Sequence, residues 1–397
     1  MTTLKVIFWI LIFIVFYAYI GYGLLLIIIV KIKRLLKGKK QGAKDDSYEP
    51  EVTLLITAFN EKDFIEQKIK NSRSLAYPRE KLNIVWCTDG SDDGTPEMLK
   101  QYDDITVYHK DERKGKVHAM NRAARLVDSP IIIFSDANTD LGKESVRRIV
   151  DMFADKRVGC VSGEKRIYSR EEDSAAGAGE GLYWKYESML KKLDGELYSV
   201  VGAAGELFAV RNELFEDVEP DTLLDDLIIS LRIAMKGYTI QYDPEAYAIE
   251  NASANVKEEL KRKVRIAAGG IQSVVRLAPL LNIFRFKTLS FQYISHRVLR
   301  WIIAPPALLM IFLLNLIMAT QYGFFSGNFY GISFWLQVLF YLMALIGWYL
   351  ENRQIKLKAL FVPYYFFIMN YAMFLGFIRY LKKQQQVTWE RAQRSKG

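Results

Sequence analysis

Long apolar stretches without charge lie near both ends of the chain and predict membrane-spanning helices. Residues 6–30 carry no charged side chain. At about 1.5 Å per residue, a helix of this length exceeds the ~30 Å hydrocarbon core of a bilayer. Residues 301–350 are also uncharged, and the polar, glycine-containing segment 321–331 divides them in two. Together with the uncharged residues 359–378, the pattern predicts four spans.

Between these ends, short apolar runs alternate with segments of helical periodicity. We expect strands at 52–58, 82–88 and 131–137, with a helix after each of the first two and another helix before the third. Strands that are apolar along their whole length are typical of a parallel sheet covered by helices on both faces. The pattern therefore predicts a soluble α/β domain with a Rossmann-like, mostly parallel sheet.

Polar clusters follow all three expected strands, at residues 59–61, 89–95 and 135–140. Ligands of parallel sheets bind at the carboxyl ends of the strands, so three clusters at successive strand ends predict one shared site. No GxGxxG follows the first strand and no GxxxxGK[ST] occurs, which removes the main support for a dinucleotide or P-loop site. A bound phosphate would instead need a metal ion and the basic residues at 114–116 and 261–265.

The composition agrees with a membrane protein that carries a water-soluble domain. The chain is 51% hydrophobic and 25% charged, which excludes a disordered chain. Its two cysteines, Cys87 and Cys160, form no disulfide or zinc pattern and favour a reducing compartment. Three histidines are too few for a histidine-rich metal centre, and the sequence names no partner for any of them.

Basic residues beside the apolar stretches predict the orientation. Six of the ten residues 31–40 are Lys or Arg, and such an excess marks the cytoplasmic side of a cell membrane. We therefore expect a cytoplasmic soluble domain, and we assign the net charge of +9 to the membrane and not to nucleic acid. The tail creates a conflict, because residues 379–397 hold six basic residues and one acidic residue, yet three further spans would place them outside. Either the last stretch does not cross completely or the charge bias is overridden.

The motifs of the soluble block resemble, in order, those of the family-2 glycosyltransferases with a GT-A fold. The matching segments are TAFNE (57–61), CTDGSDDGT (87–95), ERKGKVHAMNRA (112–123), SDANTD (135–140), GAAGELFAVR (202–211), LLDDL (223–227) and RKVRIAAGG (262–270). Each is short, but the ordered set extends over about 220 residues. With its flanking spans, the chain resembles the membrane-integrated branch that includes cellulose, hyaluronan and poly-N-acetylglucosamine synthases.

The resemblance implies a set of donor-binding residues. Asp89 matches the aspartate that contacts the nucleotide base, Glu61 lies in the neighbouring nucleotide loop, and Lys116 matches a lysine near the donor phosphates. Arg262 and Arg265 match the first and fourth positions of the QxxRW motif near the leaving diphosphate.

That last motif departs from the family pattern, because Arg262 replaces the Gln and Ile266 replaces the Trp. The Trp lies near the acceptor sugar in processive synthases. Its loss puts processive synthesis in doubt, but not sugar transfer.

The resemblance also implies a cation, Mg²⁺ or Mn²⁺, at the DxD motif, whose two ends are Asp136 and Asn138 here. Asn138 replaces a carboxylate, and because an amide oxygen binds a cation without charge, we expect weaker metal binding. Asp140 lies off the matching position but is close enough in sequence to compensate.

Asp226, in LLDDL, matches the general base, and Asp225 and Glu206 belong to the acceptor side. Because Asp225 and Asp226 precede a helical pattern, they are also compatible with helix caps favoured by the helix dipole. A structural role suits Glu206 equally well.

These observations predict a membrane-bound inverting glycosyltransferase that moves a sugar from a nucleotide donor, UDP-linked by resemblance. Its acceptor would be a growing cell-surface polysaccharide or a lipid-linked glycan, and its partners include membrane lipids. Two alternatives remain open: transfer of a single sugar to a lipid phosphate, and a non-catalytic scaffold for polysaccharide export. Asn138 and Ile266 are the features that support the scaffold.

We expect six segments along the chain. They are an N-terminal transmembrane helix (1–30), a basic juxtamembrane linker (31–50), the GT-A domain (51–280), an interfacial amphipathic helix (281–300), three transmembrane helices (301–380) and a basic C-terminal tail (381–397).

Overall fold

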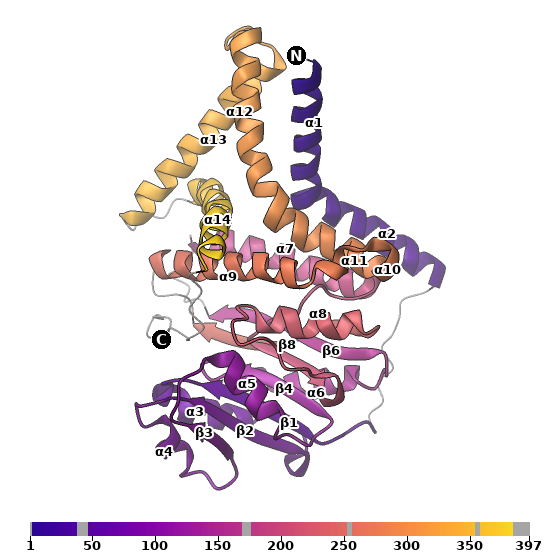
Figure 1. Ribbon diagram of the computed structural model, residues 1–397, viewed down its shortest axis with the longest axis vertical. Helices are drawn as coiled ribbons and strands as arrows, with labels where there is room; N and C mark the ends of the chain where they lie inside the picture. Colours follow the sequence, from indigo (N-terminus) through magenta and orange to yellow (C-terminus); the bar gives the residue numbers. More distant parts are fainter. Residues whose placement is uncertain (1, 38–46, 169–175, 252–255, 354–357, 384–397) are drawn as a thin grey trace.

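The computed structural model describes residues 2–37, 47–168, 176–251, 256–353 and 358–383. Figure 1 shows an elongated molecule with long helices at one end and a sheet domain at the other. A layer of helices lies between the two parts and connects them.

The sheet has eight strands in the order β3-β2-β1-β4-β7-β6-β8-β5. Their bounds are β1 Val52–Ala58, β2 Leu82–Asp89, β3 Thr106–Lys110, β4 Ile131–Asp136, β5 Asp140–Leu141, β6 Val158–Tyr168, β7 Leu207–Arg211 and β8 Thr239–Asn251. Strands β1 to β4 pair in parallel, as do β6 and β8. Strand β7 runs antiparallel to both β4 and β6. The expected α/β domain with a mostly parallel sheet is confirmed.

Helices cover both faces of the sheet, which explains why its central strands are apolar throughout. All seven residues of β1 are buried. On this strand Leu55 faces one core and its neighbours Leu54 and Ile56 face the other. Helices α5 (Lys116–Ala124) and α8 (Asp225–Met235) belong to the first core, and α3 (Ile65–Arg73) and α6 (Ser145–Met152) to the second.

Between the sheet domain and the long helices lies a layer of four helices (Figure 1). It consists of α7 (Ala176–Leu197), α9 (Val256–Arg276), α10 (Ile283–Phe286) and α11 (Thr288–Tyr293). Gly269 of α9 packs so closely on the loop before α8 that a Cβ there would lie 2.7 Å from Leu224 Cγ. Helix α9 therefore packs on the sheet domain and forms its upper surface.

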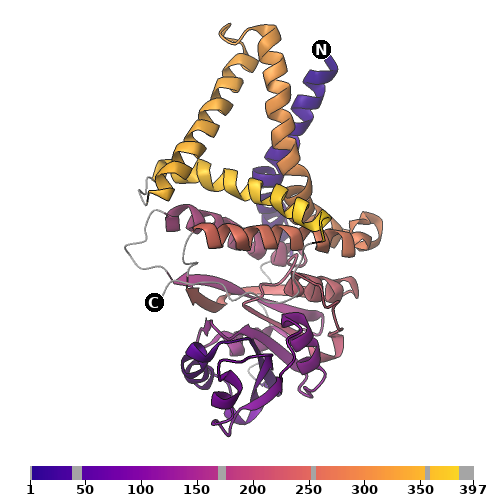
Figure 2. The same cartoon turned by 60° about the vertical axis from the view of Figure 1, so that its left-hand side comes forward.

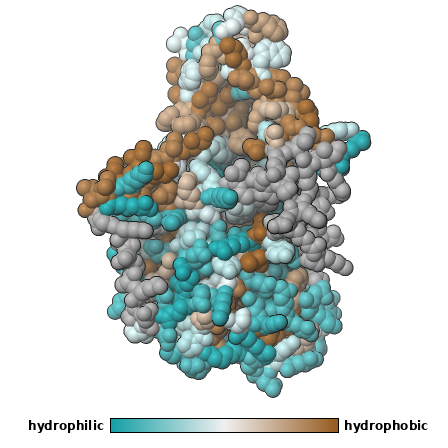
Figure 3. All heavy atoms as spheres, turned by 180° about the vertical axis from the view of Figure 1, so that it is seen from behind, coloured by the Kyte–Doolittle hydropathy of each residue, from teal (hydrophilic) through white to brown (hydrophobic). Residues whose placement is uncertain are grey.

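Four helical segments are long and apolar enough to cross a membrane: Thr2–Leu36, Thr288–Tyr322, Phe329–Glu351 and Ala359–Leu381. The first comprises α1 (Thr2–Phe16), a π-helical turn η1 (Tyr17–Gly21) and α2 (Tyr22–Lys37). The others contain a π-helical segment η7 (Ile294–Ile303), α12 (Ala304–Tyr322), α13 (Phe329–Asn352) and α14 (Lys358–Leu381). Apolar side chains cover this end of the molecule, and hydrophilic ones cover the sheet domain (Figure 3).

A buried cluster of charges joins the two parts. His296 of η7 lies with its Nδ1 atom 2.6 Å from Oδ2 of Asp194 on α7, and Tyr22 of α2 donates to the same carboxylate over 2.5 Å. Arg297 and Arg300 donate to Glu187, also on α7. Removing one partner of such a buried pair typically costs about 3–5 kcal/mol. The partners of His296 come from distant helices, which explains why the sequence did not indicate them.

Candidate active site

Asp89 lies at the carboxyl end of β2 and holds the loop before α5. Its Oδ2 atom accepts hydrogen bonds from the backbone N–H groups of Lys114 and Gly115, over 3.0 Å and 2.6 Å. The side chain is buried, and among the described residues its Oδ1 atom has no hydrogen-bond partner. A buried acceptor without a donor is unfavourable by about 1–3 kcal/mol, so Oδ1 is suited to an N–H group supplied by a ligand.

The loops after β1 and β2 are joined directly, as the shared-site prediction requires. Asn60 and Asp92 exchange hydrogen bonds: the Asn60 amide donates to the Asp92 carboxylate, and the Asp92 backbone N–H donates back to the Asn60 side chain. The backbone N–H of Glu61 donates to Thr95 Oγ1 over 3.2 Å. Glu61 therefore lies beside the loop that begins at Asp89.

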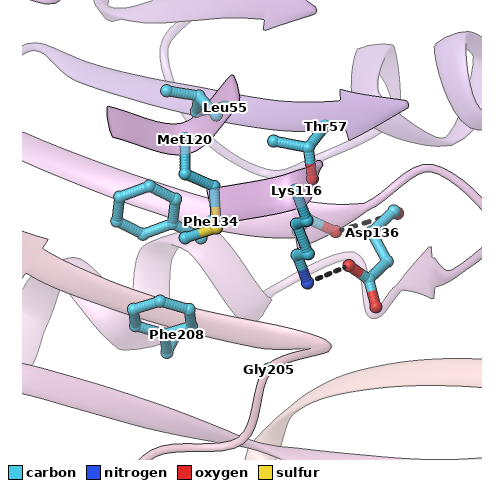
Figure 4. Close-up of a pocket in the computed structure, with 9 residues that line it drawn as sticks. Leu55, Thr57, Lys116, Met120, Phe134, Asp136, Gly205 and Phe208 are labelled. Carbon is cyan, nitrogen blue, oxygen red and sulfur yellow. Dashed lines mark hydrogen bonds and ion pairs between the residues drawn. The ribbon is translucent and has the colours of Figure 1, made fainter. Parts of the chain in front are cut away.

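Lys116 and Asp136 meet in a narrow pocket at the ends of β1 and β4 (Figure 4). The ammonium Nζ of Lys116 donates to Asp136 Oδ1 over 2.8 Å and lies 3.9 Å from Asp225 Oδ2. Burial alone would lower the pKa of Lys116, but the carboxylates of Asp136 and Asp225 outweigh it and raise the pKa. Lys116 is therefore a protonated cation between two carboxylates.

The pocket combines this charged pair with an apolar floor. Figure 4 shows Met120, Phe134 and Phe208 to one side of the pair and Gly205 on a nearby loop. The pocket is lined by Leu55, Thr57, Lys116, Met120, Phe134, Ser135, Asp136, Gly205 and Phe208.

The oxygen atoms near Asp136 suit a hard divalent cation. Asp136 and Asn138 are the first and last residues of the DxD-like motif. Asp225 adds a buried Oδ2 atom that accepts no hydrogen bond from the described residues. Mg²⁺ and similar cations prefer such carboxylate and amide oxygens. Within the described residues, no three His, Cys, Asp or Glu side chains cluster as a metal site. Two carboxylates and an amide therefore fit a cation that also uses oxygen atoms of the substrate.

Asp226 lies beside the acceptor-side loop. Gly205 approaches it so closely that a Cβ at position 205 would lie 3.3 Å from Asp226 Oδ2. Burial, followed by the neighbouring carboxylates of Asp225 and Glu206, raises the pKa of Asp226 to about 7. A carboxylate whose pKa lies near neutrality is suited to accept a proton.

Asp225 and Asp226 lie in the first turn of α8 but not at its capping position. Asp225 and Asp226 are the first two residues of α8, and the capping position itself is Leu224, which makes no side-chain cap hydrogen bond. The dipole of α8 favours negative charge at its first residues. Burial and neighbouring carboxylates nevertheless leave Asp226 with a raised pKa.

Glu206 belongs to a buried ion network and not to the proton-accepting position. Lys165 of β6 pairs with both Glu206 and Glu250. Although burial opposes it, this ammonium lowers the pKa of Glu206 to about 2. Glu206 is therefore ionised and paired with Lys165. Because a carboxylate with a low pKa is a weak proton acceptor, Asp226 is favoured over Glu206 as the base.

The two arginines of α9 have different surroundings. Arg262 makes two hydrogen bonds of 3.1 Å to Glu259 and lies 3.6 Å from Glu250, so it extends the network of Lys165. Arg265 is half-buried and forms no hydrogen bond or ion pair with the described part of the chain. Of the two, Arg265 has the guanidinium that is available to a diphosphate.

Two further residues near the site had no assigned role. Lys68 of α3 is fully buried, and its ammonium donates to Ser135 Oγ and to the Thr139 carbonyl, over 2.8 Å and 2.7 Å. It thus holds both ends of the segment that contains Asp136 and Asn138. Trp301 packs on Gly270 of α9, where a Cβ would lie 2.8 Å from the indole ring. In the sequence Trp301 is remote from the RKVR segment, so only its place in the fold brings it to α9.

The comparisons with known proteins agree with this geometry. The family described as "Glycosyl transferase family 2" matches residues 53–219. A poly-beta-1,6-N-acetyl-D-glucosamine synthase of Staphylococcus aureus is 27% identical over 248 residues, which cover 60% of this chain and 58% of that protein. The synthase of Staphylococcus epidermidis is 20% identical, over 85% of this chain and 86% of that protein.

Among solved structures, a mannosyltransferase from Pyrobaculum calidifontis, in complex with GDP-Man and Mn²⁺, superposes with a TM-score of 0.70. The two are 23% identical, and the match covers 96% of this chain and 99% of that one. At this identity the likeness shows a shared fold, which extends over the helices at the membrane end as well as the sheet domain.

Proposed function

We propose, since residues 53–219 are a family-2 glycosyltransferase domain, that this protein is a membrane-bound inverting glycosyltransferase. It would transfer a sugar from a nucleoside diphosphate donor to a glycan at the membrane surface. The observation that carries the proposal is the position of Asp226, a carboxylate with a raised pKa in the first turn of α8. Its neighbour Asp225, in the same turn, lies near Lys116, which pairs with Asp136. A proton acceptor and a diphosphate-binding centre are thereby held by one structural element.

The donor would bind across the ends of β1, β2 and β4. The unpartnered Oδ1 atom of Asp89 would accept the ring N–H of the nucleotide base, with Glu61 in the adjoining loop. Lys116 and Arg265 would bind the diphosphate, for which a guanidinium is suited because its planar fork can bind two oxygen atoms at once. Arg262 would not contact the donor. It would support the site indirectly, through its ion pair with Glu250, which also pairs with Lys165.

In the proposed reaction, the Asp226 carboxylate takes the proton of an acceptor hydroxyl as that oxygen forms its bond to the anomeric carbon. The bond from the anomeric carbon to the donor diphosphate breaks on the opposite face, and its electron pair leaves with the nucleoside diphosphate. General-base catalysis of this kind typically contributes ~10²–10⁴-fold. Lys116 and Arg265 stabilise the charge that develops on the leaving group, and in enzymes such electrostatic stabilisation usually accounts for most of the rate enhancement.

A divalent cation, Mg²⁺ or Mn²⁺, would be held by Asp136 and Asn138, with Asp225 adjoining. When bound, it would neutralise charge on the diphosphate. The Lys116 ammonium lies between the carboxylates of Asp136 and Asp225 and holds them near each other. Both carboxylates are thereby positioned to bind a metal cation in addition to the ammonium.

The donor is proposed to be a UDP-linked N-acetylhexosamine. The support is the similarity to synthases named for poly-beta-1,6-N-acetyl-D-glucosamine, although this chain spans only 58% of the length of the S. aureus protein. The membrane is proposed to be the cell membrane, with the catalytic domain on its cytoplasmic side, because residues 31–40 are strongly basic.

A second candidate is the transfer of one sugar to a lipid phosphate. Ile266 favours it, since it replaces the aromatic residue of processive relatives and is partly exposed on α9. The solved mannosyltransferase that shares this fold was bound to GDP-Man, so a GDP-linked donor is tested as well. Uracil and guanine both carry a ring N–H, so the position of Asp89 is compatible with either nucleotide.

The deciding experiment is a donor screen with the purified full-length protein in lipid nanodiscs. Radiolabelled UDP-N-acetylglucosamine, other UDP-sugars and GDP-mannose would be supplied with Mg²⁺ or Mn²⁺, and products separated by size. A ladder from a UDP-sugar supports polymer synthesis, and a single lipid-extractable product supports the second candidate. Absence of both transfer and donor hydrolysis, with Asp226→Asn as the reference for background, would support an export scaffold instead.

A further inference from the structure

Helix α14 has the length of a membrane span but not the orientation of one. In Figure 2 it runs across the molecule just above α9, whereas α12 and α1 run along the long axis. In Figure 1 the same helix is seen end-on, so both views place it crosswise. If α1 and α12 follow the membrane normal, then α14 lies in the plane of the bilayer.

The contacts of α14 give the same result. Near its start, Leu360 and Tyr364 lie against Gly347, in the last turns of α13. In its middle, Tyr19 donates to Asn370 over 2.7 Å, at the bend of the first apolar helix. The first contact lies near the end of α13, and the second lies at η1, between α1 and α2.

Towards its end, α14 packs on the catalytic domain itself. A Cβ on Gly376 would lie 2.5 Å from Ala267 Cβ and 2.8 Å from Ala268 N, both on α9. Ala372, one turn earlier, is buried as well, and such small residues four apart allow two helix backbones to approach closely. The sixteen helical steps from residue 360 to residue 376 would carry a spanning helix ~24 Å away from its starting level. Instead, Gly376 contacts α9, which packs on the loop preceding Asp225.

The distribution of apolar side chains fits an in-plane helix with a covered underside. An ordinary interfacial helix turns a polar face to water, but α9 occupies that side of α14. The opposite face is apolar and exposed, through Val362, Phe367, Tyr371, Phe377, Ile378 and Leu381. That face matches the acyl region of one leaflet.

The charges of the chain agree as well. Residues 351–358 and 379–397 both carry an excess of Lys and Arg. A spanning helix would place these two basic segments on opposite sides of the membrane, against the charge bias. An in-plane helix keeps both on the side of the catalytic domain and removes the conflict present in the sequence.

We propose that α14 is not a membrane span but an in-plane helix that lies in the leaflet facing the catalytic domain, with its apolar face toward the acyl chains. The described chain then crosses the bilayer three times, and the C-terminal tail lies on the catalytic side. The partner of this surface is the lipid leaflet, and α9 lies directly beneath α14. The proposal does not depend on which sugar is transferred.

The side of the tail is tested by labelling with a membrane-impermeant maleimide. Single cysteines would be introduced by Lys100→Cys on the catalytic domain, Ser326→Cys in the loop between α12 and α13, and Ser395→Cys in the tail. The background is favourable, because Cys87 and Cys160 are both buried. Spheroplasts and inverted vesicles of an expression host would be compared. We expect the tail cysteine to be labelled in the same preparation as position 100, and labelling together with position 326 would overturn the proposal.

The depth of the helix provides an independent test. Nitroxide labels at Val362, Tyr371 and Ile378 should report depths in a reconstituted bilayer that agree within roughly one helical turn, about 5 Å. A spanning α14 would separate the first and last labels by ~24 Å along its axis, and that result would refute the in-plane orientation. Labels at Ile332, Leu339 and Ile346, which are similarly exposed on α13, are the matched control and should show a depth gradient.

Discussion

Lys116 and Asp136 form a 2.8 Å ion pair that joins the start of α5 to the end of β4. The pair lies at the point where the β3–α5 loop, held by Asp89, meets the first residues of α8. Donor binding and proton transfer are thereby linked through one lysine, since Lys116 also lies 3.9 Å from Asp225, the neighbour of Asp226. Substitutions in this region should therefore separate into effects on chemistry and effects on binding.

Asp226→Asn preserves the shape of the side chain but removes its ability to accept a proton. We expect transfer to fall by ~10²-fold or more. The affinity for UDP with Mn²⁺ should change by less than about threefold, well under the tenfold of ~1.4 kcal/mol. Turnover and calorimetric titration measure the two effects, and Asp128→Asn on an exposed loop is the control. Near-normal transfer in the Asp226 variant would redirect attention to Asp225.

The pH profile should report the same group. Asp226 accepts a proton only when ionised, and its pKa is raised to about 7, so kcat/KM should be low in acid and rise through about pH 7. Because the Asp225 carboxylate contributes to that rise in pKa, Asp225→Asn should move the midpoint to lower pH. A midpoint that stays in place or moves upward would contradict this electrostatic coupling.

The same raised pKa has a consequence for stability. The folded protein holds the Asp226 proton more tightly than an unfolded chain, where the pKa is near 3.8. This contribution to the free energy of unfolding is complete below about pH 4 and is lost as the pH rises through about 7. Asp226→Asn should flatten the pH dependence of the apparent Tm over this interval, and an unchanged slope would assign it to other groups.

Asn138→Asp should strengthen cation binding by adding a charged ligand. We expect the Mn²⁺ concentration for half-maximal activity to fall by roughly tenfold, on the order of 1.4 kcal/mol. Activity measured over a cation titration gives the answer. If the requirement is unchanged, position 138 does not contact the cation, and Asp140→Asn becomes the next variant to measure.

Arg262 and Arg265 should give different defects despite lying three residues apart. Arg265→Met removes a guanidinium without a partner among the described residues, so it should raise the KM for the donor and leave the Tm nearly unchanged. Arg262→Met breaks the contacts to Glu259 and Glu250, so it should lower the Tm. Identical profiles for the two variants would contradict the division of roles.

Lys68→Met should weaken cation binding without touching the cation site directly. The ammonium holds Ser135 and Thr139, and its loss should loosen the segment 135–140 and raise the cation requirement severalfold. Lys70→Met, on the exposed face of the same helix, is the matched control. If Lys68→Met lowers only the Tm and leaves the cation titration unchanged, the role of Lys68 is purely structural.

Much of the soluble fold was predictable because its determinants are local. The run 52–58 is apolar at nearly every position, and it forms a strand buried on both faces. Three polar clusters follow parallel strands, and parallel strands place their carboxyl ends on one edge, so the location of Asp89 and Asp136 on one edge was also predictable. The family resemblance is confirmed by the match to residues 53–219.

Tertiary structure alone determined which charges are paired and which remain available. The sequence presents Arg262 and Arg265 as equivalent members of one motif, but Glu259 of the same helix and Glu250 of β8 pair only with the first. It presents His296 without a partner, because Asp194 lies on a helix about a hundred residues earlier. It predicts residues 359–378 as a span but leaves open whether that stretch crosses completely, because hydropathy measures how apolar a helix is and not which way it points. The packing of Gly376 on Ala267 supports the proposed in-plane direction, and such a contact depends on where two distant helices come together.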